Sequence, residues 1–186
     1  MSETRIASRY AKPLLELAVE RNCLEEVAKD MTAFTALCHS NRDFTLMLKN
    51  PVLGHLNKLV ILKKIFTGKV NDLTLSIFDI ISRKNREAYL PAIAKEFHRQ
   101  YNVMKGIAEA TITTVVPLNA ELKKEVTAVV KNITGKEGVE LTEKIDDSII
   151  GGFILKIGDR QIDDSISSKL NELKLKFSQN LYVNKM

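Results

Sequence analysis

Four aspartates stand in two pairs, Asp146-Asp147 and Asp163-Asp164, and each pair lies inside the same five letters, Ile-Asp-Asp-Ser-Ile. Neighbouring carboxylates of this kind can bind a divalent cation or act as a general acid and base. Each pair, however, lies at the expected start of a structural element, where short polar side chains hydrogen-bond to nearby backbone amides. We therefore interpret the repeated pentapeptide as two capping or turn clusters.

The other residues that could do chemistry are scattered. His39, His55 and His98 lie in three separate segments of helical pattern, and Cys38 is adjacent to His39, so their side chains would lie on different faces of a helix. This pattern supports neither a zinc site nor a Cys/His nucleophile. Two cysteines make no disulfide framework, and a reducing compartment is the default expectation.

Sequence motifs for phosphate binding and hydrolysis are missing. Gly151-Gly152 belongs to no GxGxxG or GxxxxGK[ST] pattern, and we expect it to form a tight bend before a strand. No GxSxG or HExxH motif occurs either. The sequence therefore predicts no catalytic, cofactor-binding or metal-binding residues. A small cytosolic enzyme remains a rival class, although it would need a polar pocket and no nucleophile–base pairing is apparent.

Charge is distributed unevenly along the 186 residues, whose formal net charge is +5. Residues 1–105 hold 17 Lys and Arg against 11 Asp and Glu, whereas residues 106–186 hold 11 against 12. The basic residues of the first part are interleaved with acids, as on a solvated helix face, and no aromatic pattern or known RNA module accompanies them. We expect no nucleic-acid partner, and a basic nucleic-acid-binding protein or another helical adaptor is the alternative interpretation.

The spacing of apolar residues predicts the helices and strands that position these side chains. Up to about residue 105 this spacing is helical. The expected helices are Arg5–Glu20, Leu24–Cys38, Asp43–Leu48, His55–Phe66, Leu73–Ser82 and Arg86–Met104. Pro13 predicts a kink or an irregular turn near Arg9. Residues 73–77 also alternate, so a strand competes there. Short loops favour a compact antiparallel bundle of six helices.

Two of these helices have apolar faces wider than contact with a single neighbouring helix would cover. Arg5–Glu20 has a wide apolar face, on which Ala7, Ala11 and Ala18 would let another helix approach closely. Leu73–Ser82 is apolar on nearly all sides. Such faces are either buried in a core or covered by a partner, and they indicate recognition of a helix in a groove.

After Gly106 the period changes to alternation. We expect a strand over Glu109–Val116, a helix capped by Asn119 and ending at Gly135, strands Val139–Ile145 and Phe153–Ile157, a turn at Gly158-Asp159 and a short return through Gln161 and Ile162. The last helix carries Ile166, Leu170, Leu173, Phe177 and Leu181. The fold class is thus mainly α: a helical domain, 1–105, and a small C-terminal α/β (α+β) domain, 106–186, with the order strand-helix-strand-strand-helix.

Motifs spread along the whole chain resemble the delta subunit family of bacterial F-type ATP synthase, which includes the oligomycin-sensitivity-conferring protein. Arg9-Tyr10-Ala11-Lys12 with Leu14-Leu15 is similar to the family's opening RYAxALL, and Asn50-Pro51 with Lys58 and Leu62 is similar to its NP…K…L stretch. Residues 146–153, 157–159 and 162–165 resemble the family's D-x-SIIGGF…IGD…IDgS signature, although Asp164 stands where glycine is usual. Pro13 departs from a common alanine.

The resemblance implies a non-catalytic stator subunit that joins the alpha/beta catalytic head to the peripheral stalk, so that proton-driven rotation is coupled to ATP synthesis. It implies that N-terminal segments of the alpha subunits bind between the first and fifth helices, where we expect contacts from Tyr10, Ala11, Leu14, Ser76, Ile77 and Ile80. A core role for Leu14 and Ile77 is the alternative. On this view Ala11→Asp weakens head binding and leaves the fold intact.

For the C-terminal domain, the resemblance implies binding to the end of the peripheral-stalk b subunit. Phe153, Leu170 and Leu173 are the expected contacts, with a core role for the two leucines as the alternative. The longest hydrophobic run, Ile149–Leu155, falls far short of the roughly twenty residues of a membrane-spanning helix. The resemblance therefore implies a peripheral protein that partners hold at the cytoplasmic face of a bacterial cell membrane.

Overall fold

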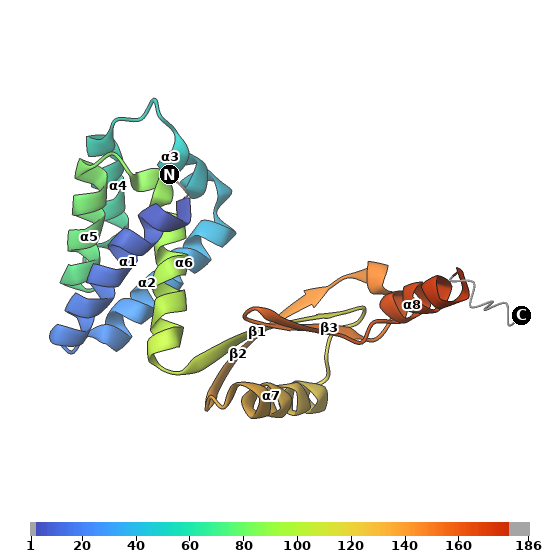
Figure 1. The fold of residues 1–186 in the computed structure, drawn as a ribbon. Helices are drawn as coiled ribbons and strands as arrows, with labels where there is room; N and C mark the ends of the chain where they lie inside the picture. Colours follow the sequence, from blue (N-terminus) through green and yellow to red (C-terminus); the bar gives the residue numbers. More distant parts are fainter. Residues whose placement is uncertain (1–2, 179–186) are drawn as a thin grey trace, which may run out of the picture. The chain divides into compact units, whose positions relative to one another are not determined.

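The computed structural model describes residues 3–178 of the chain. Its contacts divide the protein into two compact units, with the division between Met104 and Lys105 (Figure 1). Each unit has a hydrophobic core of its own. The two units are therefore described separately.

The first unit is a bundle of six α-helices: α1 (Glu3–Glu20), α2 (Leu24–Ser40), α3 (Arg42–Lys49), α4 (His55–Phe66), α5 (Asp72–Arg83) and α6 (Leu90–Met104). A short 3₁₀ helix, η1 (Glu87–Tyr89), precedes α6. Asparagine side chains cap two of the helices: Asn41 accepts a hydrogen bond from the Phe44 amide at 3.0 Å, and Asn71 accepts one from the Leu73 amide at 3.0 Å. These caps satisfy amides that helices leave without intrahelical partners at their N-termini.

Aromatic rings and small residues build the core of this bundle. Phe34 lies 5.7 Å from Phe66 and 5.3 Å from Phe78, measured between ring centroids, which is within the range of favourable aromatic pairs. Helix α1 packs along α6, and its buried Ala7, Ala11 and Ala18 present little bulk. The expected close approach of another helix to this alanine face is therefore confirmed.

Three local predictions for the bundle need correction. Of the kink or irregular turn expected near Arg9, the irregular turn is absent, because α1 is helical throughout Glu3–Glu20. Both Arg9 and Pro13 are exposed, so water can satisfy the carbonyl that Pro13 leaves without an amide donor. The strand alternative for residues 73–77 is wrong, since they belong to α5. Residues 87–89 form η1 and are not the first turn of a long α-helix.

The second unit is a four-stranded sheet with two helices. Its elements are β1 (Ile107–Thr114), α7 (Ala120–Thr134), β2 (Gly138–Ile145), a 3₁₀ turn η2 (Asp147–Ile149), β3 (Phe153–Ile157), β4 (Arg160–Asp163) and α8 (Ile166–Ser178). The strand order is β2-β1-β3-β4; β1 is parallel to β2, and the other pairs are antiparallel. The predicted fold class is confirmed, but the short return is a full fourth strand.

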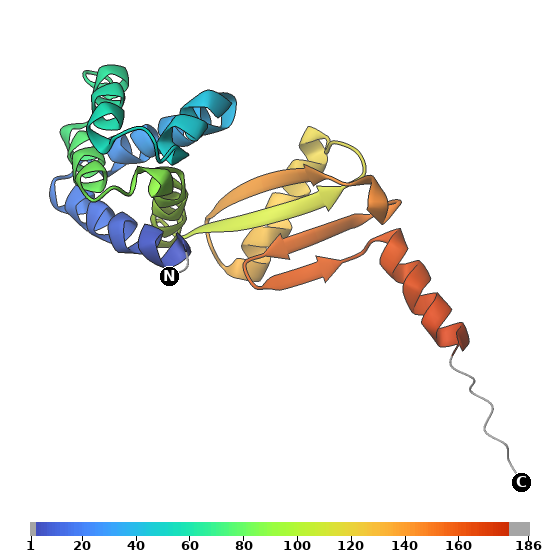
Figure 2. The ribbon, with the colours of Figure 1, turned by 90° about the horizontal axis from the view of Figure 1, so that it is seen from above.

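Helix α7 covers one face of this sheet (Figure 2). The buried side chains alternate along β1 and pair with those of β3 in register, so that Ile112 lies opposite Leu155 and Ala110 lies opposite Ile157. Val130 of α7 completes this small core. Helix α8 contributes no buried residue to it.

Candidate partner-binding surfaces

Both aspartate pairs act at turns. Asp146 accepts a hydrogen bond from the Ser148 amide at 3.0 Å, and Asp163 accepts one from the Ser165 amide at 2.9 Å. The hydrogen bonds from Ser148 and from Ser165 lower the pKa of Asp146 and of Asp163, respectively. The predicted capping role is therefore confirmed for both residues. Among residues 3–178, no group of three or more His, Cys, Asp or Glu side chains is arranged to hold a metal ion.

The two cysteines are free and half-buried. Burial raises the pKa of the Cys38 thiol to about 11, although a hydrogen bond with Thr45 acts in the opposite direction. A thiol of that pKa is protonated at neutral pH, and the thiolate is the reactive form. The Cys38 side chain packs against the core of the bundle.

Three of the residues predicted to bind a partner helix lie in the bundle core. The exposed fraction is 0% for Ala11, 2% for Leu14 and 9% for Ile77. The expectation that Ala11→Asp leaves the fold intact is therefore wrong, because it would bury an unpaired carboxylate. The sequence could not separate these side chains from surface ones, since both kinds continue the same apolar stripe.

Tyr10, Ser76 and Ile80 remain accessible on α1 and α5, which contact each other. Arg86, just beyond α5, donates a hydrogen bond from Nη1 to the Tyr10 hydroxyl at 3.0 Å, and its guanidinium lies 5.9 Å from the ring centroid. This contact ties α1 to the end of α5. Ile80 is 48% exposed on α5, and Ser76 lies one turn before it.

Leu17 belongs with these residues, although sequence reasoning did not select it. It is 43% exposed and lies seven positions after Tyr10, which places the two on the same side of α1. Helical spacing from Tyr10 was the available signal. Helices α1 and α5 together thus present accessible apolar side chains over a buried layer that includes Leu14 and Ile77.

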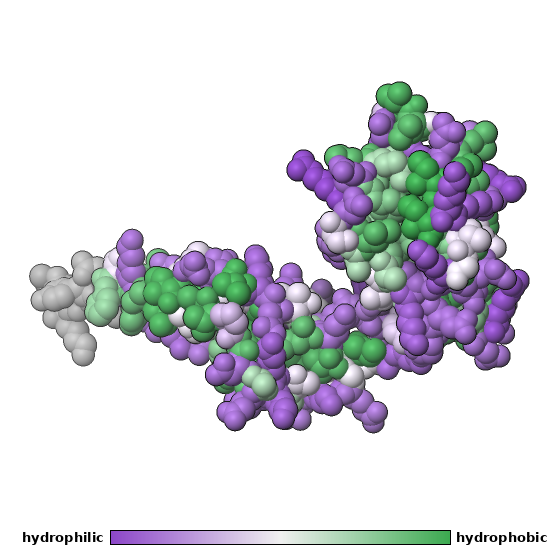
Figure 3. All heavy atoms as spheres, turned by 180° about the vertical axis from the view of Figure 1, so that it is seen from behind, coloured by the Kyte–Doolittle hydropathy of each residue, from purple (hydrophilic) through white to green (hydrophobic). Residues whose placement is uncertain are grey.

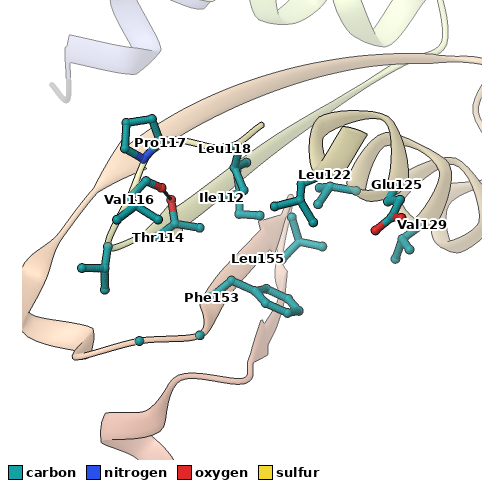
Figure 4. Close-up of a pocket in the computed structure, with 14 residues that line it drawn as sticks. Ile112, Thr114, Val116, Pro117, Leu118, Leu122, Glu125, Val129, Phe153 and Leu155 are labelled. Carbon is teal, nitrogen blue, oxygen red and sulfur yellow. Dashed lines mark hydrogen bonds between the residues drawn. The ribbon is translucent and has the colours of Figure 1, made fainter. Parts of the chain in front are cut away.

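The second unit has an apolar groove of about 460 Å³ between α7, β1, β3 and the loop after β1 (Figure 4). Buried Ile112 and Leu155 lie at its base, whereas Phe153 of β3 and Leu122 and Val129 of α7 are 36%, 47% and 46% exposed. In Figure 4 the side chains of α7 and β3 point toward one another across it. Phe153, selected from the sequence, therefore lines a real groove.

Helix α8 carries an exposed apolar stripe. Ile166, Leu170, Leu173 and Phe177 follow one another at helical spacing and are 44%, 52%, 48% and 86% exposed. Apolar side chains gather along this helix in Figure 3. The alternative that Leu170 and Leu173 belong to the core is therefore wrong for this structure. Leu181, predicted to continue the stripe, lies outside the described residues.

Comparisons with known proteins match this fold over nearly its whole length. The family model described as ATP synthase delta (OSCP) subunit matches residues 6–177. The chain belongs to the ATP synthase delta (OSCP) subunit family. ATP synthase subunit delta of Cytophaga hutchinsonii is 40% identical over 96% of this chain and 97% of the relative. The protein of the same name from Christiangramia forsetii is 37% identical over the full length of both chains.

A solved structure shows the same fold. A chain in the cryo-EM structure of the Toxoplasma gondii mitochondrial ATP synthase hexamer matches with a TM-score of 0.75 and 22% identity, over 94% of this chain and 98% of its own length. Membership of the family makes the present chain a subunit of F-type ATP synthase and a component of its stator. Within the described part of the chain, no helix combines the length and apolar character needed to cross a bilayer.

Proposed function

We propose that this chain is a non-catalytic connector with one binding surface on each unit. The bundle would bind N-terminal segments of the alpha subunits, and the small α/β unit would bind the C-terminal end of the peripheral-stalk b subunit. The observation that carries the proposal is helix α8, an amphipathic helix whose described residues are all outside the core.

Energetics favour a partner for α8. A helix of 13 residues is marginally stable by itself in water, since most helical stability in proteins comes from packing of an apolar face. Here that face is bare, from Ile166 to Phe177. Burial of an aliphatic side chain contributes about 1.5–3 kcal/mol, so a partner helix on Leu170 and Leu173 would stabilise α8 as it binds.

On the stalk side, the groove and α8 meet. Gly151 lines the groove, and its carbonyl oxygen accepts a hydrogen bond of 3.0 Å from the amide of Ile166, the first residue of α8. The apolar surface therefore continues from Phe153 in the groove to the helix. An apolar face of this shape suits an amphipathic helix laid along it.

On the head side, Tyr10, Leu17, Ser76 and Ile80 are the contacts we propose for an alpha-subunit helix. Ile80 and Leu17 supply exposed apolar area from α5 and α1. The Tyr10–Arg86 contact fixes the two helices against each other at one end of this surface. Because the surface is formed before binding, less conformational freedom is lost on association.

A connector under torque needs long-lived binding and no chemistry. Nanomolar affinity corresponds to about −12 kcal/mol, which apolar anchors in a groove can supply. Through such partners the chain would be held at the cytoplasmic face of the membrane as a peripheral component. Two surfaces on one chain also raise the effective concentration of each partner for the other.

Calorimetric titration of the full chain tests this proposal with two probes, a synthetic peptide of the alpha N-terminus and a soluble b subunit without its membrane segment. Ile80→Asp should weaken binding of the alpha peptide at least about tenfold, and Leu170→Asp should do the same for b. Each variant should bind the other probe as the wild type does. Both substituted side chains are about half exposed, so the fold should persist.

Lys64→Asp on the exposed face of α4 serves as a charge-change control and should leave both affinities unchanged. Wild-type protein that binds neither probe would contradict the proposal. Nucleic-acid binding with a steep salt dependence would instead favour the basic-protein interpretation.

A further inference from the structure

Hydrogen bonds join the residues at the start of α8 to the beginning of β3 and to the bend before it. The amides of Asp164 and Ile166 donate to the carbonyl oxygens of Phe153 and Gly151, both at 3.0 Å. Ser165, only 1% exposed, accepts a hydrogen bond at Oγ from the Ser168 amide at 3.2 Å. The direction in which α8 leaves the sheet is therefore set where the helix begins.

Two glycines make this junction sterically feasible. A Cβ atom on Gly152 would lie 2.3 Å from the Asp164 carbonyl oxygen and 3.1 Å from the Ser165 Cα atom. Its φ of +78° is also in the region that L side chains rarely adopt. A Cβ atom on Gly151 would lie 2.7 Å from Cδ1 of Ile166. At Gly152 the chain thus passes the start of α8 with no room for a side chain, whereas a side chain on Gly151 would require the end of the Ile166 side chain to move.

We propose that Gly151 and Gly152 are positioning residues that aim α8, so that its apolar stripe and the groove form one continuous surface for a b-subunit helix. Both glycines line the groove, and both approach the start of α8. This inference rests on the proposed function.

The physical benefit is preorganisation. A bare helix attached through a loose joint would sample many directions, and fixing it on binding would cost free energy that lowers affinity. A tight joint removes that cost before the partner arrives. Substitution at the joint should therefore lower the affinity for the b subunit while the unit still folds.

The first experiment compares the full-length wild type with Gly152→Ala and Gly158→Ala. Gly158 has a φ of +56° and nothing within 4 Å of an added Cβ, so it carries a comparable backbone cost without the steric conflict. Gly152→Ala should bind the soluble b subunit at least about tenfold more weakly, and Gly158→Ala within about twofold of the wild type. All three proteins should bind the alpha peptide equally.

A spectroscopic measurement distinguishes a change in the orientation of α8 from a general loss of stability. Spin labels at Lys124 of α7 and Lys174 of α8, both exposed, report the distance between the two helices by pulsed electron resonance. The wild type and Gly158→Ala should show one narrow distance distribution. Gly152→Ala should show a shifted or broader one. A narrow, unchanged distribution in Gly152→Ala would overturn the inference.

A compensating pair gives an independent test that remains decisive should Gly152→Ala fail to fold. Gly151→Ala should weaken b binding about threefold or more, since it displaces Ile166, and Ile166→Val, which removes Cδ1, should restore affinity in the double variant. Ile166→Val alone provides the reference. Equal affinity of Gly151→Ala and the wild type would overturn the inference, whereas a wild type that does not bind b would overturn the proposed function.

Discussion

At the scale of single residues, the structure shows that neighbours within one sequence motif have different roles, one at the surface and one in the core. Tyr10 and Ala11 are neighbours in one family motif, yet Tyr10 reaches the Arg86 guanidinium while Ala11 is buried against the bundle. Lys58, named in the sequence only as part of a motif, is 6% exposed. Its ammonium donates to the Leu48 carbonyl oxygen at 3.0 Å and lies 4.0 Å from Glu87 Oε2.

Lys58→Met should destabilise the bundle by about 3–5 kcal/mol, because it leaves the buried Glu87 carboxylate and the Leu48 carbonyl without their cation. Urea unfolding followed by far-ultraviolet circular dichroism measures the change. The double variant Lys58→Met/Glu87→Leu should recover most of the loss, since no charge then remains buried. The exposed Lys64→Met is the matched control on the same helix. A single-variant loss of under about 1 kcal/mol would show that the pair is dispensable.

At the scale of elements, α8 differs from every other helix for which buried residues are described. Helices α1 to α7 each bury at least one side chain, and α8 buries none. The small core of the second unit is complete with β1, β3 and α7. Helix α8 therefore adds no buried residue to that core, which supports its proposed role as a binding element.

Removal of residues 169–186 should leave the sheet and α7 folded, because the truncation deletes no buried residue described for this unit and keeps the Ser165–Ser168 cap. Amide hydrogen exchange of β1 and β3 should be unchanged, while affinity for the soluble b subunit should fall by about tenfold or more. Loss of exchange protection throughout the sheet would show that α8 stabilises the fold.

At the scale of the whole molecule, the two units have separate cores, and the basic excess belongs to the first. Net charge of this kind governs solubility and association kinetics, not the fold. The proposed connector requires both units on one chain, since each surface is proposed to bind a different partner.

Fragments 1–104 and 105–186 should each fold and bind their own probe with wild-type affinity, because neither core draws residues from the other unit. An equimolar mixture of the fragments should nevertheless fail to restore ATP-driven proton pumping to ATP synthase depleted of this subunit. The chain link that supplies a high effective concentration is then broken. Restored pumping by the mixture, at the level of the intact chain, would show that the link is not required.

The sequence by itself determined the family and most of the elements. Helical periodicity, strand alternation and Gly135 as a left-handed helix end are local features, so they can be predicted without knowing what packs against them. Asn119, expected to cap α7, stands at the N-cap position but makes no side-chain capping hydrogen bond. The motifs from Arg9 to Ser165 likewise depend on order and spacing alone.

Only the tertiary structure decided which apolar side chains are free. Ala11 and Leu14 are core and Ile80 is surface, although all three continue apolar helical stripes, because burial depends on what the rest of the chain places against each face. For the same reason Leu170 and Leu173 proved to be exposed, and Gly151-Gly152 proved to be a junction with α8 as well as a bend before a strand. Periodicity records that a face is apolar, whereas long-range packing decides whether the protein itself or a partner covers that face.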